Sequence, residues 1–222
     1  MTIEEAVKSR HTVRKYIHRQ IPDEVVRQIS DRLDISNEKY GLHMKLMTEN
    51  TEAFGSVFKL ILAKGVRNYI ILAGKDMPDT DEKLGYAGID AALYAQTLGL
   101  NSWWVGGTFS RKKVAQIAEL SADEKMTGII AVGYGETQGV QHKMKKAEEI
   151  SRYKGDAPEW FRKGVAAVLL APTALNKQAF MVEGDGDKVS ISRENGIFSG
   201  TDLGIAKYHF EVGAGKNNFV WA

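Results

Sequence analysis

The chain has 222 residues, of which 43 % are hydrophobic and 26 % charged, and its formal net charge is +2. This composition is ordinary for a globular protein of one large or two small intertwined domains, and it shows no basic face for nucleic acid. The absence of cysteine excludes disulfides, thiolate catalysis and cysteine-ligated metals.

Three further observations narrow the class of protein. The five histidines lack any metal-ligand spacing, so we expect no metal site. No apolar run approaches the ~18 residues of a membrane span, and the first ten residues are polar where a signal peptide is apolar. We therefore expect a cytoplasmic protein that binds neither membrane nor nucleic acid.

The first half of the chain alternates predicted helices with buried strands. Thr2 is placed to cap a short helix, and Pro22 with Asp23 opens a second one whose apolar residues share a face. The longest predicted helix is rich in small residues on nearly every side, which predicts close approach of its neighbours. We expect helices over 2–8, 81–98 and 110–120, and a further helix that begins at 22–23. The expected strands are 43–47, 69–73, 102–105 and 126–132.

The second half begins near Gly155. A helix is predicted over 158–170, and the turn residues 184–187 predict a hairpin between strands 179–183 and 188–192. A helix over 202–212 and a terminal strand over 218–221 complete the chain. Helices interspersed with strands, together with the hairpin, favour the α+β class.

Two basic clusters are candidate phosphate ligands. Arg10, His11, Thr12 and Arg14 bring two guanidiniums, an imidazole and a hydroxyl together just after a helix, and arginine suits bidentate phosphate binding. In the second cluster, alternation along an extended segment would place Lys143 and Lys145 on one side. Each cluster taken alone also fits an exposed basic turn or loop.

Two other segments could contact a planar ligand. Gly106 and Gly107 follow a predicted strand, where glycine lets backbone amides approach a ligand closely, although a tight turn is the alternative. Segment 171–178 offers small residues, a hydroxyl and two amides, which both donate and accept; a helix stop at Pro172 is the alternative. The fingerprints GxGxxG and GxxxxGK[ST] are absent, which argues against dinucleotide Rossmann and P-loop sites.

Together these four segments resemble the nitroreductase family of FMN enzymes over most of the chain. The resemblance implies that Arg10, Arg14, Lys143 and Lys145 hold the FMN phosphate, and that His11 and Thr12 hold the ribityl chain. It further implies that the amides of Gly106 and Gly107 face the flavin ring. Its most specific part is the proline-containing segment, which implies that the ring's other edge contacts Pro172, Thr173, Ala174 and Asn176.

One departure from the family pattern suggests how the chain is organised. In ordinary members the proline-containing segment follows the first long helix, but here residues 33–38 do not match it and the segment stands at 172–178. Ordinary members are intertwined homodimers whose subunits share each flavin site. We therefore expect a single-chain pseudo-dimer with one composite site, like a divergent branch represented by a Thermotoga protein. Its halves would be 1–154, with the phosphate and most ring contacts, and 155–222, which completes the site.

A weak internal echo accords with two similar halves. Residues 90–94 and 202–206 each lie in a predicted helix that leads through a glycine turn to an aromatic strand, although chance similarity is the alternative. Two neighbouring features have uncertain roles. Trp103 and Trp104 could shape the pocket or form a buried aromatic strand, and Arg67 with Asn68 could face the flavin pyrimidine.

The resemblance implies an FMN-dependent oxidoreductase that passes electrons from NADH or NADPH to a nitroaromatic, quinone or similar acceptor. The flavin does the chemistry, so we expect binding residues and no catalytic acid–base pair. Two alternatives stay open: a flavin-binding store or sensor without turnover, and a flavin-free interaction module. The chain would act as a monomer or as a homodimer.

Overall fold

The computed structural model describes residues 1–54 and 63–222. Its helices are α1 (Ile3–Ser9), α2 (Asp23–Tyr40), α4 (Thr80–Thr97), α5 (Arg111–Ala118), α6 (Ala147–Ile150), α7 (Glu159–Val168) and α8 (Ser199–Ala214), with 3₁₀ turns η1 (Ala174–Asn176) and η2 (Lys216–Asn218). Its strands are β1 (Lys45–Met47), β2 (Asn68–Lys75), β3 (Asn101–Val105), β4 (Glu124–Gly133), β5 (Ser151–Tyr153), β6 (Phe180–Asp185), β7 (Lys188–Arg193) and β8 (Val220–Trp221). This mixture, in two separate sheets, confirms the α+β class.

The first sheet is antiparallel and has the strand order β1-β2-β4-β3. Along β2, Ile70 and Leu72 belong to the core cluster shared with α2 and α4, whereas Tyr69 and Ile71 belong to the cluster on the opposite face. Both faces are therefore covered, which explains why β2 is an unbroken apolar run. Strand β3 forms one edge of this sheet.

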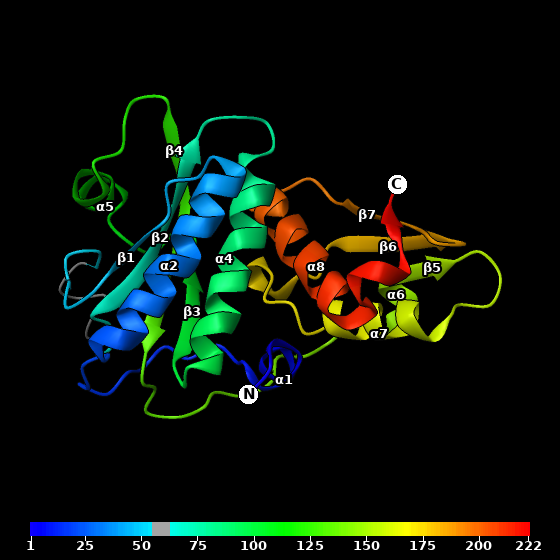
Figure 1. Ribbon diagram of the computed structural model, residues 1–222, viewed down its shortest axis with the longest axis horizontal. Coiled ribbons are helices and arrows are strands. Elements are labelled where there is room, and N and C mark those ends of the chain that lie inside the picture. Colours follow the sequence, from blue (N-terminus) through cyan, green and yellow to red (C-terminus); the bar gives the residue numbers. More distant parts are fainter. Residues whose placement is uncertain (55–62) are drawn as a thin grey trace.

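The second sheet has the order β5-β6-β7-β8, with β6 and β7 joined as an antiparallel hairpin. The outer pairs, β5 with β6 and β7 with β8, are parallel. Its core contains Phe161 of α7, Phe210 of α8, and Phe219, whose ring meets that of Phe210 edge-on at 5.0 Å. Figure 1 shows α4 and α8 lying between the two sheets.

Helices α4 and α8 meet at two glycines in a reciprocal way. A Cβ on Gly85 would collide with the backbone of Thr201, and a Cβ on Gly204 would collide with the backbone of Glu82. Each glycine thus faces the residue three positions before the other glycine. This reciprocity relates Gly85 to Gly204, a register different from the echo of 90–94 with 202–206.

The predicted elements agree with the structure except at a few places. The terminal strand is shorter than 218–221, because Asn218 ends the 3₁₀ turn η2. Region 135–149 reads as a loop in the sequence, but the short helix α6 begins inside it at Ala147. Strand β5 follows directly after α6. The unassigned apolar stretch 54–63 falls largely outside the described residues. Among residues 1–54 and 63–222, no helix is both long and apolar enough to cross a membrane.

Candidate functional site

Two of the predicted ligand segments lie at the two ends of the edge strand β3. At its start, Thr12 forms a parallel bridge with Ser102, and the Val13 amide donates to the Ser102 carbonyl at 3.1 Å. At its other end stand Gly106 and Gly107. At about 3.3 Å per residue, Ser102 and Gly106 lie about 13 Å apart along the strand. The first basic cluster and the glycine turn therefore lie at opposite ends of one elongated site.

Arg10 is the least expected member of the basic cluster, because its side chain is buried. It caps the C-terminal end of α1 and is only 6 % exposed. Its guanidinium forms no hydrogen bond or ion pair with any residue in 1–54 or 63–222. Burial lowers the pKa of Arg10 to about 10. A buried, unpaired guanidinium is costly for the folded protein and is available to an anionic ligand.

The charge of Arg10 acts on two histidines, His11 and His209. Burial, then Arg10, then His142 lower the pKa of His11. His209 of α8 is completely buried, and its pKa is lowered to about 3, mainly by burial and further by Arg10 and His142. His142 is anchored by its Nε2, which lies 2.9 Å from the Leu169 carbonyl oxygen. At neutral pH the imidazoles of His11 and His209 are therefore uncharged, and Arg10 carries the charge of the cluster.

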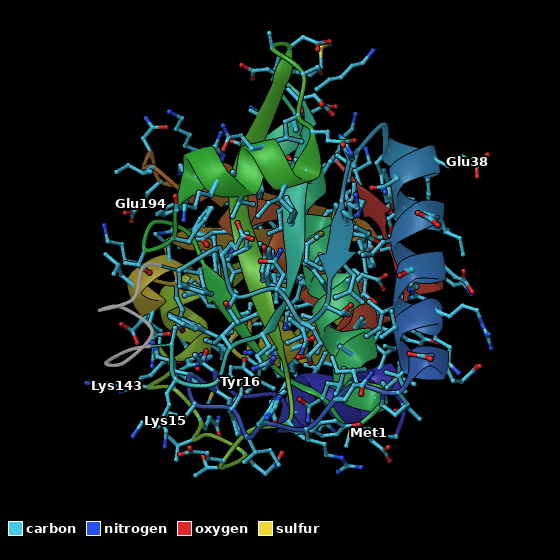
Figure 2. The ribbon with its side chains drawn as sticks, turned by 90° about the vertical axis from the view of Figure 1, so that its left-hand side faces the viewer. Met1, Lys15, Tyr16, Glu38, Lys143 and Glu194 are labelled. Carbon is cyan, nitrogen blue, oxygen red and sulfur yellow. The ribbon has the colours of Figure 1, made fainter. Side chains whose placement is uncertain are left out.

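The second basic cluster is joined directly to segment 172–178. Asn176 and Gln178 both donate side-chain amide protons to the Lys143 carbonyl, at 2.8 and 2.9 Å. The Lys145 amide donates to Gln178 Oε1, and Lys145 Nζ donates to the Gln178 carbonyl, both at 3.0 Å. Lys143 itself is exposed, and Figure 2 shows Lys143 and Lys15 projecting from the same side of the molecule.

Segment 172–178 has a strained backbone. Leu175, Asn176 and Gln178 have φ values of 54°, 53° and 45°, in the left-handed region that non-glycine residues rarely adopt. The hydrogen bonds to Lys143 and Lys145, and one from the Gln178 amide to Thr173 Oγ1, hold it there. Such strain of about 1–3 kcal/mol per residue is concentrated at binding and active sites.

The glycine turn meets the second half of the chain at the start of α8. A Cβ on Gly106 would overlap the ring of Phe198, the N-cap residue of α8. One turn later, Asp202 accepts a hydrogen bond from the Ala174 amide at 3.0 Å, and burial raises the Asp202 pKa to about 6. Within the described residues, the amides of Gly106 and Gly107 donate no hydrogen bond. Two backbone donors are therefore free at this end of β3.

Four residues with open roles are also placed. The Arg14 guanidinium lies over the ring of Trp103 at 5.5 Å, whereas Trp104 packs on the opposite face against Gly88. The Trp pair thus forms a buried strand, of which Trp103 faces the basic cluster. Arg67 is paired with Glu49 at 2.6 Å, and Asn68 accepts from the Glu49 amide, so both hold residue 49 in place.

A cavity of about 320 Å³ lies away from these residues, between α2, α4 and α8. Both carboxylates in its wall have cationic partners: Asp90 pairs with Arg32 at 2.6 Å and Glu211 with Lys216 at 2.7 Å. None of the predicted flavin ligands lines it. The carboxylates of this cavity are therefore already paired within the protein.

Sequence reasoning missed the residues that join the segments. Gln178, which is 1 % exposed, links both lysines to the strained segment, and Phe198 and Asp202 join that segment to the glycine turn. His209 is affected by the charges of both Arg10 and His142. Gln178 stood within a recognised motif, but the two histidines are separated by more than 60 positions and carried no local signal.

Comparison with known proteins agrees with this fold. A family model described as "Putative TM nitroreductase" matches residues 2–214. A solved structure from Thermotoga maritima, titled a "putative nitroreductase", is 24 % identical and superposes with a TM-score of 0.69, covering 98 % of this chain and 85 % of the other. No curated protein sequence matches the chain.

Two more distant structures share the fold. A "putative nitroreductase in complex with fmn" from Desulfovibrio desulfuricans is 17 % identical with a TM-score of 0.56, covering 71 % of this chain and 98 % of that one. A "Putative NADH dehydrogenase/NAD(P)H nitroreductase" from Parabacteroides distasonis is 18 % identical with a TM-score of 0.54, covering 67 % and 95 %. The match over residues 2–214 shows that the chain belongs to the TM nitroreductase family.

Proposed function

We propose that the chain binds one FMN along β3 and acts as an FMN-dependent oxidoreductase. The observation that carries this proposal is the presence of free donors near both ends of β3. The Arg10 guanidinium, which has no anionic partner among the described residues, lies two residues before the bridge of Thr12 to Ser102, and the free amides of Gly106 and Gly107 follow the strand. In FMN, the phosphate would lie at the guanidinium, the ribityl chain would extend along β3, and the polar atoms of the flavin ring would lie at the glycine amides. The FMN bound in the Desulfovibrio desulfuricans relative agrees with this assignment.

The phosphate end would be held by cations from two segments. Arg10, Arg14, Lys143 and Lys145 supply the charge, and Thr12 with His11 lies beside them for the ribityl hydroxyls. Lys145 Nζ uses one proton on the Gln178 carbonyl and keeps two for a phosphate oxygen. Because Gln178 and Asn176 hold the loop of Lys143, the second half of the chain positions ligands that belong to the first half.

The ring end would be held mainly by backbone. The amides of Gly106 and Gly107 can donate to ring atoms that gain negative charge on reduction. We expect the remaining edge of the ring to contact Pro172, Thr173, Ala174 and Asn176. When bound, the flavin supplies hydride transfer, from NADH or NADPH to a nitroaromatic, quinone or similar acceptor. The residues around it bind and orient, and we assign none of them as a catalytic acid or base.

The organisation as a pseudo-dimer remains part of this proposal. The reciprocal contact of Gly85 and Gly204 supports two related halves, 1–154 and 155–222, that share one flavin site. The strained segment occurs once and the basic cluster once, in opposite halves. A cytoplasmic location, and a monomeric or homodimeric state, stay predictions.

Absorbance spectroscopy of the purified protein tests the cofactor. We expect the bands of oxidised flavin and release of one FMN per chain on denaturation. Two symmetric flavins per chain would refute the composite site, and a protein that takes up no FMN would refute the function. Oxidation of NADH or NADPH with and without an added quinone then separates an oxidoreductase from a store or sensor.

Substitution of Arg10 tests the phosphate assignment. Replacing it with glutamine removes the buried charge, and we expect FMN binding to weaken by about 1.5–3 kcal/mol, the value of a hydrogen bond to a charged group. Arg27→Gln is the matched control, because Arg27 is exposed and pairs only with Glu24 of its own helix. Equal FMN affinity in both variants would contradict the assignment.

A further inference from the structure

Arg10 and His209 come from two helices that pack against each other: Arg10 caps α1, and His209 lies in α8. The Arg10 side chain is 6 % exposed, and its guanidinium has no acceptor in the described part of the chain. The Nε2 atom of His209 is a buried polar atom without any hydrogen-bond partner among the same residues. Proteins rarely leave a buried polar atom unpaired, because that atom gives up its hydrogen bonds to water without a replacement.

The tautomer of His209 follows from its other nitrogen. Nδ1 lies 2.9 Å from the Ile205 carbonyl oxygen, which can only accept, so Nδ1 carries the proton. Nε2 of the neutral imidazole is then a lone pair. His209 is therefore a buried hydrogen-bond acceptor, and the positive charge of Arg10 is among the groups that lower its pKa.

We infer that His209 is a positioning residue for phosphate binding: its Nε2 accepts a hydrogen bond from Arg10 and orients the guanidinium toward the ligand phosphate. This inference rests on the proposed FMN function and adds to it a residue outside the basic cluster. The guanidinium has five N–H donors in a planar fork, so one can face His209 while others face a phosphate oxygen.

The arrangement also explains why an imidazole suits this position. His209 lies on α8 in the second half of the chain, whereas Arg10 follows α1 in the first half. Its pKa is lowered to about 3, so it stays neutral and keeps its lone pair across the ordinary pH range. A carboxylate here would neutralise Arg10 and compete with the phosphate, whereas a neutral acceptor orients the cation without cancelling its charge.

Paired titrations with FMN and riboflavin test the inference, because the two ligands differ only in the phosphate. We expect His209→Leu to weaken FMN binding about tenfold and to leave riboflavin binding unchanged, so that the FMN-to-riboflavin affinity ratio falls. His209→Gln, which offers a neutral acceptor, should restore most of the ratio. Equal weakening of both ligands would show a merely structural role and overturn the inference.

A second measurement needs no substitution at His209. In ¹⁵N NMR of the wild-type imidazole, the Nε2 resonance should move on addition of FMN and stay in place with riboflavin, and Arg10→Gln should abolish the movement. An Nε2 resonance that ignores FMN bound at full occupancy overturns the inference and leaves the proposed function intact. Failure of the wild-type protein to bind FMN at all overturns both.

Discussion

Asp90 and His209 occupy corresponding places in the two helices that meet at the centre of the molecule. Each lies five residues after a crossing glycine, Gly85 in α4 and Gly204 in α8. Asp90 accepts two hydrogen bonds from Arg32, at 2.7 and 2.6 Å, and another from the Tyr208 hydroxyl. His209 is also affected by an arginine, Arg10, but its Nε2 has no hydrogen-bond partner among the described residues.

The difference separates a region that serves the fold from one that serves a ligand. Around Asp90 the chain satisfies its own polar groups, and the neighbouring cavity contains charges that are already paired. Around His209 the chain leaves a cation and a lone pair unsatisfied, and the segment that completes the site is strained. A folded protein usually retains strained or unpaired groups, which lower its stability, where they serve a binding site.

The largest effect should come from the helix crossing on which this comparison rests. In Gly204→Ala, the new Cβ would overlap the backbone of Glu82, so the helices must separate, and we expect a loss of about 3 kcal/mol or more in unfolding free energy. Gly196→Ala is the control, because open space surrounds that position. Urea unfolding that shows both variants equally stable would remove the structural basis for comparing Asp90 with His209.

Next in size is the loss of the paired arginine. Arg32→Met leaves the Asp90 carboxylate, which is 11 % exposed, without its cation, and we expect a loss of about 2–3 kcal/mol. This expected loss of unfolding free energy is small for a buried ion pair, because the Arg32 side chain is 38 % exposed. Adding Asp90→Asn should recover part of the loss, and a double-mutant cycle by urea unfolding measures the coupling. A coupling near zero would contradict the assigned ion pair.

Removal of the unpaired arginine should act in the opposite direction. In the FMN-free protein, Arg10→Met removes a buried charge that has no partner, and we expect a gain of about 1 kcal/mol. Saturating FMN should then stabilise the wild type more than the variant, since only a ligand that binds the native state raises its stability. Thermal unfolding with and without FMN measures both. If the FMN-free variant is destabilised like Arg32→Met, Arg10 has an internal partner and the contrast between the two regions fails.

Much of the fold could be predicted because its elements are long and locally coded. The helices α4 and α8 and the strands β2 and β4 were recognised from small-residue content, apolar runs and flanking glycines. Strand β5 could not be found, because three residues show no periodicity and it exists only through its parallel pairing with β6. The start of the terminal strand was misplaced for a different reason: the Asn218 amide donates to the Gly215 carbonyl, which makes Asn218 part of a turn.

The candidate site divides in the same way. Arg10, Thr12, Lys143 and Asn176 stood in short clusters whose residue types suggested a phosphate and a flavin. Burial of Arg10 was not foreseeable, because it depends on segments that meet only in the folded chain. His209 looked like an ordinary residue of a core helix for the same reason.

The smallest expected effect is a pH dependence in which Asp202 and His209 oppose each other. The pKa of Asp202 is raised from 3.8 to about 6, so between these values the native state holds the extra proton and stability falls as pH rises. The pKa of His209 is lowered from 6.5 to about 3, so the unfolded state holds the extra proton and stability falls as pH drops through that window. Between pH 4 and 6 the two slopes largely cancel.

Single substitutions should expose each slope. Asp202→Asn leaves the histidine term, and the unfolding free energy should then fall by up to about 1.4 kcal/mol per pH unit on acidification from 6 to 4. His209→Gln leaves the aspartate term, and the unfolding free energy should rise over the same range. Urea unfolding at several pH values measures both. Parallel pH profiles for the two variants would mean that burial does not hold His209 neutral. The contrast between Asp90 and His209 would then have no electrostatic basis.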